Sequence, residues 1–145
     1  MNQQREGGFL ISKIHQLSQR IFNNILKKNG LDAFNSSQGR IIYAILRYNN
    51  IPIHELVRKT QLTKSTLSSH IDNLEKTGYI KRVPSKKDKR EIFILSTEKI
   101  NSVQEEYIRV SKEMTKIFYN GFDDKEIILF EDLLNRCLNN LLGYK

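Results

Sequence analysis

The sequence predicts a mainly α-helical fold with one small β-hairpin. Apolar residues recur at three- and four-residue spacing along most of the 145 residues, which is the period of an amphipathic helix. Between residues 79 and 97 this pattern gives way to two short runs rich in β-branched and aromatic residues, which is typical of strands. A chain of this length can bury a real core, so we expect a single domain over residues 1–145.

Two helices are expected in the first third of the chain. The first carries an apolar stripe and ends at Gly30 after a basic last turn; the stripe is Leu10, Ile14, Leu17, Ile21 and Ile25. A second helix follows a potential cap at Ser36-Ser37 and ends by Asn49-Asn50. Its apolar positions are Ile41, Ile42, Ile45 and Leu46.

Two shorter helices follow, joined by a brief connection. The third helix comes after Pro52, with Leu56 and Val57 facing inward. Thr63 can cap the fourth helix, which stops at Gly78. Its apolar residues share one face at i, i+4 and i+7: Leu67, Ile71 and Leu74. The opposite face is hydroxyl-rich and short-chained: Ser65, Ser69, Asp72 and Lys76, flanked by Thr66, Ser68 and Asn73.

A hairpin with a basic loop is expected next. Residues 79–83 and 92–95 have strand character, and Pro84-Ser85 stops the first strand. The loop is too long for a two-residue turn, so it should project from the body. Residues 81–91 carry a net charge of +4, half of the chain's +8, although Asp88 lies inside the basic run. By itself such a loop is either a solvated surface or a nucleic-acid contact.

Two long helices complete the chain. Thr97 can cap the first, which ends at Asn120-Gly121 and whose stripe is Val103, Tyr107, Val110, Met114 and Ile117. Asp123, with Glu126 three residues later, resembles a capping box for the last helix. That helix carries Ile127, Phe130, Leu134, Cys137, Leu138 and Leu141, which is a wide apolar surface for a helix with one wet face.

This element order describes a winged helix-turn-helix lobe over residues 35–97. Short polar side chains on the fourth helix suit entry into the major groove, because they leave room and can bond phosphates and base edges. The alternative is an ordinary solvent face, although such faces usually favour Glu, Lys and Gln. The helices at residues 8–30 and 98–143 would then form a separate dimerisation layer.

Composition narrows the function classes. The net charge and a pI near 9.6 indicate nucleic acid or an anionic surface as partner. One cysteine excludes a disulfide framework, and no membrane-length apolar run or secretory signal is seen, so a cytoplasmic protein is expected. His15, His54 and His70 lack a metal-ligand spacing. No catalytic pair or cofactor motif appears, so we expect no enzyme, no cofactor and no metal.

The segment LTKSTLSSHIDNLEKTGYIKRVPSKKDKREIFILSTEK resembles the recognition helix and wing of the MarR family of bacterial transcription regulators. The matching positions are Leu62, Asp72, Leu74-Glu75, Gly78, Ile80-Lys81-Arg82, Asp88-x-Arg90 and Thr97-Glu98-Lys99. The chain departs from the family pattern at Ser69, where many relatives carry arginine, at Ser96 and at Ile100. A related branch, the staphylococcal accessory regulator-like winged helices, is an alternative.

The resemblance implies a regulator that binds roughly palindromic duplex DNA as a homodimer. The recognition helix, about 63–77, would enter the major groove, and the wing, about 83–91, would reach the minor groove. Arg90 would be the minor-groove or phosphate contact and Asp88 its organiser. The expected DNA-binding residues are Lys64, Ser65, Thr66, Ser68, Ser69, Asn73, Lys86, Lys87, Lys89 and Arg90.

The dimer interface is expected on both ends of the chain, at Leu10, Ile14, Leu134, Leu138 and Leu141, with a self-contained monomer as the alternative. Cys137 is expected to pack in the core.

Relatives often bind a small aromatic or lipophilic effector. The residues that could line its site are Phe9, Phe34, Tyr43, Tyr107 and Phe118, although core packing is preferred for these rings. The rival function is a winged-helix module that binds a protein partner or RNA through its basic hairpin.

Overall fold

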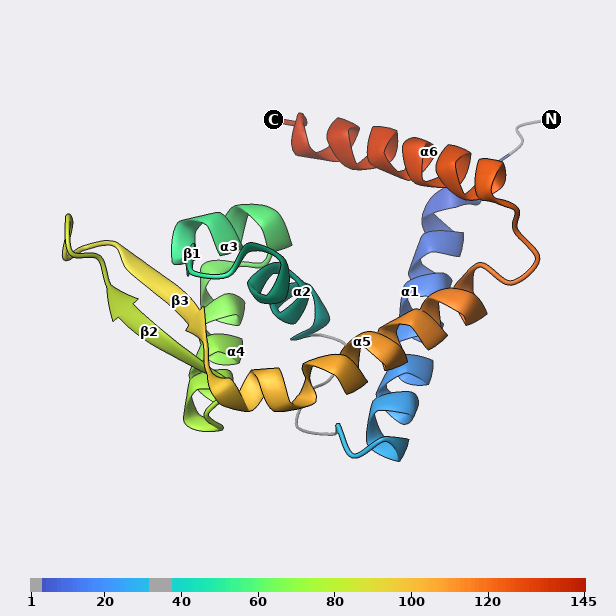
Figure 1. The fold of residues 1–145 in the computed structure, drawn as a ribbon. Helices are drawn as coiled ribbons and strands as arrows, with labels where there is room; N and C mark the ends of the chain where they lie inside the picture. The colour runs from blue at the N-terminus through green and yellow to red at the C-terminus, as the bar shows by residue number, and fades with distance from the viewer. Residues whose placement is uncertain (1–3, 32–37) are drawn as a thin grey trace. The chain divides into compact units, whose positions relative to one another are not determined.

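The computed structural model describes residues 4–31 and 38–145, so the expected cap at Ser36-Ser37 and the side chain of Phe34 lie outside the described residues. The described chain is mainly helical with a small antiparallel sheet, which confirms the predicted fold class (Figure 1). The elements are α1 (Gly7–Lys28), α2 (Gly39–Tyr48), β1 (Ile51–Pro52), α3 (Ile53–Thr60), α4 (Lys64–Lys76), β2 (Ile80–Pro84), β3 (Ile92–Ser96), α5 (Glu98–Phe118) and α6 (Asp124–Leu142). The chain forms two compact units, residues 1–111 and 112–145.

The sheet has one strand more than the expected hairpin. β2 and β3 pair antiparallel from Ile80 opposite Ser96 to Pro84 opposite Ile92, and their loop extends away from α2, α3 and α4 (Figure 1). The short β1 pairs with the other edge of β3, giving the order β1-β3-β2. A strand of two residues is too short to show an alternating pattern in the sequence, so β1 is not predictable from it. Its pairing with β3 defines it as a strand.

The core of the first unit is built from the inward faces that the spacing predicts. Leu67, Ile71 and Leu74 of α4 are buried, as expected from their i, i+4 and i+7 positions. They share one cluster with Leu56 of α3, the apolar positions of α2, and residues of the sheet and α5. This packing holds α4 by its inner face and leaves its polar face exposed.

Local signals fix both ends of α4. The Thr63 hydroxyl accepts a hydrogen bond from the Thr66 amide at 3.3 Å, which confirms the predicted N-cap. Gly78 ends the helix with a φ of 89°, a conformation that a residue with a Cβ rarely adopts. The Thr97 hydroxyl donates to the Gly78 carbonyl at 2.5 Å, and its capping of α5 stays a prediction. The end of α4 is therefore tied to the end of the sheet.

The second unit is a capped helix with exposed apolar residues. The Glu126 amide donates to the Asp123 carboxylate (2.8 Å) and the Asp123 amide donates to the Glu126 carboxylate (3.0 Å), which confirms the predicted capping box. Four rings contact one another around the turn before α6: Phe118, Tyr119, Phe122 and Phe130. No residue of α6 is buried.

Several expected core residues are exposed. Cys137 is exposed in the single chain, so its predicted core packing is wrong. Phe9 and Tyr43 are 67% and 63% exposed, and Phe118 is also exposed, which contradicts the core interpretation for these rings. Tyr107 alone of the described set is buried, and its ring meets Phe22 edge-on with 6.2 Å between centroids. An apolar stripe alone does not show whether its residues are covered within the single chain.

Candidate nucleic-acid interface

The polar face of α4 presents the side chains that the sequence singled out. All six are exposed: Lys64, Ser65, Thr66, Ser68, Ser69 and Asn73. The Thr66 hydroxyl already accepts a hydrogen bond from the Thr63 hydroxyl (2.9 Å), so it takes part in the helix cap. The other hydroxyls and the Asn73 amide leave a surface of short side chains that a groove edge can approach.

Arg82 joins α4 to the first strand of the wing. Its Nη1 donates to Glu75 Oε1 at 2.6 Å, and its backbone N donates to Glu75 Oε2 at 3.0 Å. Its Nη2 donates to Asp72 Oδ1 at 2.5 Å. The hydrogen bond to Asp72, with that to Glu75, raises the pKa of the guanidinium above its ordinary value. This forked contact fixes the wing against α4. Because its charge is paired with Glu75 and Asp72, Arg82 is not a free cation for a ligand.

The wing loop is held by two short side chains. The Ser85 hydroxyl accepts from the amides of Lys87 (3.2 Å) and Asp88 (3.3 Å). Asp88 Oδ1 accepts from the backbone N of Arg90 at 3.0 Å and from its Nε at 3.3 Å. The Arg90 side chain is 93% exposed, so the loop is set by its own hydrogen bonds while the guanidinium faces solvent. The structuring role of Ser85 was not anticipated.

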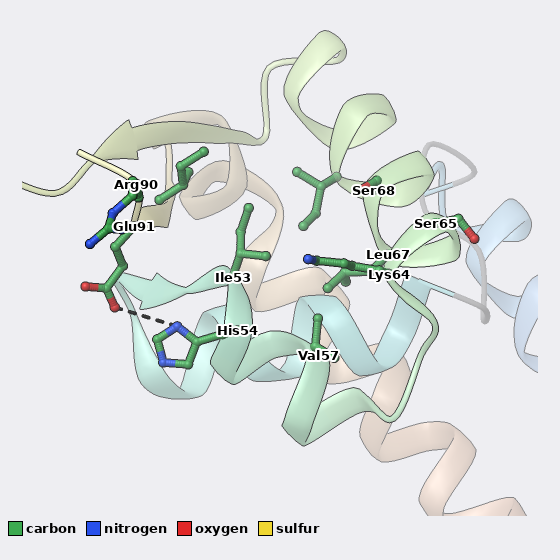
Figure 2. A pocket seen from close by; sticks show the side chains of 11 residues that line it. Ile53, His54, Val57, Lys64, Ser65, Leu67, Ser68, Arg90 and Glu91 are labelled. Atoms are coloured by element: carbon green, nitrogen blue, oxygen red, sulfur yellow. Dashed lines mark ion pairs between the residues drawn. The ribbon is translucent and has the colours of Figure 1, made fainter. Parts of the chain in front are cut away.

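A groove of about 660 Å³ lies between α3, α4 and the base of the wing (Figure 2). Figure 2 shows Lys64, Ser65 and Ser68 on one side and His54 and Arg90 on the other. The apolar part of its wall includes Ile53, Val57 and Leu67. The groove brings four predicted DNA-binding residues together from two elements that are separate in sequence.

The remaining wing lysines do not line this groove. Lys86, Lys87 and Lys89 are exposed on the loop between β2 and β3. His54 does line the groove, although the sequence marks it only as an isolated histidine. Its Nδ1 lies 3.6 Å from Oε1 of Glu91, a residue of the wing. No local pattern signals this pair, because the two residues are far apart in the chain.

A second hollow, of about 470 Å³, lies between α2 and α3. It is lined by Arg40, Tyr43, Tyr48 and Lys59 among others, and the Lys59 Nζ lies 4.1 Å from the centre of the Tyr48 ring. Hydrogen bonds from Lys59 and then Arg47 lower the pKa of Tyr48. Of the described rings expected near an effector, this hollow includes Tyr43.

The expected dimer residues are accessible in the single chain. Leu10, Ile14, Leu138 and Leu141 are exposed, and Leu134 is half-buried. Within residues 4–31 and 38–145, no helix combines the length and apolarity needed to cross a membrane. Over the same residues, no three His, Cys, Asp or Glu side chains gather where they could hold a metal ion.

Residues 34–92, which span α2 to the start of β3, match the model of the MarR family. This segment is similar to the MarR family of transcriptional regulators. It is 26% identical over 141 residues to the HTH-type transcriptional regulator PecS of Dickeya dadantii, covering 92% of this chain and 80% of PecS.

Two solved structures share the fold of this chain. One is a mutant MarR from E. coli complexed with operator DNA, with a TM-score of 0.80, 23% identity and coverage of 90% of this chain and 92% of that one. The other is the PcaV transcriptional regulator from Streptomyces coelicolor in complex with its natural ligand, with a TM-score of 0.82, 18% identity and coverage of 96% and 98%.

Proposed function

We propose that this protein is a MarR-family regulator of transcription that binds roughly palindromic duplex DNA as a homodimer. The observation that carries the proposal is the groove where Lys64, Ser65 and Ser68 of α4 meet Arg90 of the wing. Cations and hydroxyls from two elements converge there on a chain of net charge +8. The solved MarR from E. coli with operator DNA has the same fold and supports this assignment.

The two elements have different roles in this proposal. Residues 63–77 enter the major groove, where Ser65, Ser69 and Asn73 approach base edges and phosphates. The wing, residues 83–91, reaches the minor groove, where Arg90 suits a narrow and negative surface. The Nε of Arg90 donates a hydrogen bond to Asp88, whereas its Nη groups make no hydrogen bond to a described residue. Lys86, Lys87 and Lys89 neutralise phosphates without reading sequence.

The homodimer accounts for the exposed apolar residues at the two ends of the chain. We assign dimerisation to residues 8–30 and 98–143, with Leu10, Ile14, Leu134, Leu138 and Leu141 in the interface. A two-fold axis would place two copies of α4 on successive major grooves, about one helical turn apart. This arrangement requires a pseudo-palindromic site.

The proposal extends to effector control and cellular location, on the similarity to MarR-family regulators. We assign the protein to the cytoplasm, with no enzymatic activity and with a small aromatic or lipophilic molecule as its regulator. PcaV, which shares the fold, was solved in complex with its natural ligand. The hollow beside Tyr43 and Tyr48 is one place where an aromatic ring could bind on this chain.

The rival function is binding of a protein partner or RNA through the same basic hairpin. Incubation of the protein with a pool of genomic duplex fragments, followed by recovery and sequencing of the bound fraction, separates the two. We expect enrichment of pseudo-palindromic fragments and affinity that falls steeply as salt rises. If no fragment outcompetes bulk DNA while single-stranded RNA binds more tightly, sequence-specific DNA binding is wrong.

A further inference from the structure

His54 lies where the helix-turn-helix meets the wing. It is the second residue of α3, its side chain is 66% exposed, and it lines the groove that also contains Lys64 and Arg90. Figure 2 shows its ring directed toward Glu91, with Nδ1 at 3.6 Å from Oε1. The ring therefore faces the same space as the proposed DNA contacts.

The groove around His54 contains both acidic and basic side chains. Its Nε2 lies 3.9 Å from Glu55, but Glu55 also accepts a hydrogen bond from Arg58 at 2.7 Å. Glu91 is the acid on the wing side, and Lys64 and Arg90 are the cations lining the groove. An incoming phosphate would add negative charge beside the ring, which favours the imidazolium over the neutral form.

We propose that His54 is a further DNA-binding residue that contacts a phosphate as an imidazolium, held toward the groove by Glu91. This inference rests on the proposed DNA-binding function. The amides at the start of α3 add partial positive charge beside the ring, which also favours an anion there. DNA binding by this protein is therefore coupled to proton uptake at His54.

The sign of the coupling follows from which form binds DNA. The imidazolium attracts phosphate and the neutral ring does not, so affinity is highest at low pH and falls as pH rises across the range in which histidine titrates, about pH 5 to 8. Each subunit takes up at most one proton. Between pH 6 and pH 8 a dimer should lose about tenfold or more in affinity for a duplex. The loss of two phosphate contacts should reduce the slope of log affinity against log salt by about 1.8.

The test is a titration of a labelled duplex, selected as above, with the full-length protein at pH 6, 7 and 8 and constant ionic strength. A scrambled duplex of equal length serves as a second probe. Because a phosphate contact is independent of sequence, both duplexes should show the same loss of affinity with pH. His54→Gln should bind more weakly at pH 6 and lose most of the pH dependence. His54→Lys should remain tight at pH 8, because its charge does not titrate in this range.

A matched control comes from another histidine of the chain, on a helix outside the proposed DNA-binding elements. His15→Gln on α1 should keep the pH dependence of the unmodified protein. Glu91→Gln removes an acid from the groove, so it should tighten binding at pH 8 and move the pH response to lower pH. An NMR titration of the His54 ring protons should show a midpoint that moves to higher pH when the duplex is added.

The outcomes separate this inference from the function on which it rests. If the protein binds no duplex at any pH, the proposed function fails. If it binds duplexes but its affinity is equal at pH 6 and pH 8, or His54→Gln keeps the full pH response, the role of His54 is wrong. An unmoved NMR midpoint with bound duplex overturns it as well, even where a variant folds poorly.

Discussion

The winged-helix region and helix α6 use their apolar residues in opposite ways. Among the described residues, every buried apolar side chain lies between Leu26 and Val110. In α6 none is buried, although Leu129 and Leu141 are as apolar as any core residue. Full burial of one leucine stabilises a fold by about 1.5–3 kcal/mol, so the first region obtains its stability internally.

This difference indicates what each sequence encodes. The winged-helix region specifies a core, because its inward faces match across α2, α3, α4 and the sheet. Helix α6 specifies its own start through the Asp123–Glu126 capping box, and its apolar residues form a surface that the single chain leaves in water. A contiguous apolar surface of this kind is typical of an interface between subunits. The proposed homodimer would cover it.

The largest expected effect is loss of the dimer on Leu138→Asp. A charge placed in an apolar interface without a partner costs roughly 3–5 kcal/mol per copy, and a dimer contains two copies. Sedimentation should show a dimer for the unmodified protein at micromolar concentration and monomers or aggregates for the variant. The control is Asn140→Asp, which adds the same charge at an exposed polar position of α6. A folded unmodified protein that stays monomeric at all concentrations would falsify the dimer proposal.

A core substitution in the other region should act on folding. Leu74→Ala removes a fully buried side chain of α4 and leaves a cavity, so the free energy of unfolding should fall by about 2–5 kcal/mol. Chemical denaturation followed by circular dichroism measures this loss. Leu141→Ala in α6, where the side chain is exposed in the single chain, should cost much less at protein concentrations below dimerisation. Equal losses for the two variants would contradict the contrast between the regions.

Buried Tyr107 of α5 gives the first unit a sensitivity to alkaline pH. Burial raises the pKa of its phenol from 10.0 to about 12. The neutral phenol is favoured in the folded state, so its stabilisation is complete below pH 10 and is lost as pH rises toward 12. Two pKa units correspond to about 2.7 kcal/mol. Thermal unfolding should show that Tyr107→Phe loses less stability between pH 9 and pH 11 than the unmodified protein. Indistinguishable losses would show that another group dominates.

Local signals made much of the fold predictable. The cap at Thr63, the stop at Gly78 and the capping box at Asp123 are each read from residues within four positions, and all three are confirmed. The inward face of α4 follows from spacing alone. Asp88 and Arg90 are two residues apart, so their contact in the loop is equally local.

Contacts between distant residues were not predictable. The strand β1 depends on pairing with β3 about 40 residues later, and Arg82 reaches back to Asp72 and Glu75 only because a turn reverses the chain. The approach of His54 to Glu91 has the same origin. The apolar stripe predicts core packing for Cys137, but spacing alone does not distinguish a stripe that packs within the single chain from one that stays exposed there.

The wing loop is exposed like α6, but its conformation is fixed within the chain, so substitutions there should affect DNA binding with little effect on folding. Arg90→Ala should weaken binding by about 1–3 kcal/mol and reduce the preference for A·T-rich flanks. Lys87→Ala should weaken all duplexes evenly and reduce the salt slope by about one unit per removed contact. Fluorescence anisotropy with A·T-rich and G·C-rich flanks distinguishes them. If both variants lose affinity evenly, Arg90 does not read groove width.

The smallest and most discriminating effect is expected for Asp88→Ala. The substitution removes a negative charge, so electrostatics alone predicts tighter binding to every duplex. It also removes the acceptor that holds the backbone N and Nε of Arg90, so an organising role predicts weaker binding to the selected site and unchanged or tighter binding to a scrambled one. Titrations of both duplexes at two salt concentrations separate these results. Equal tightening on both would mean that the loop contributes only charge, and that its hydrogen bonds do not position Arg90 for DNA.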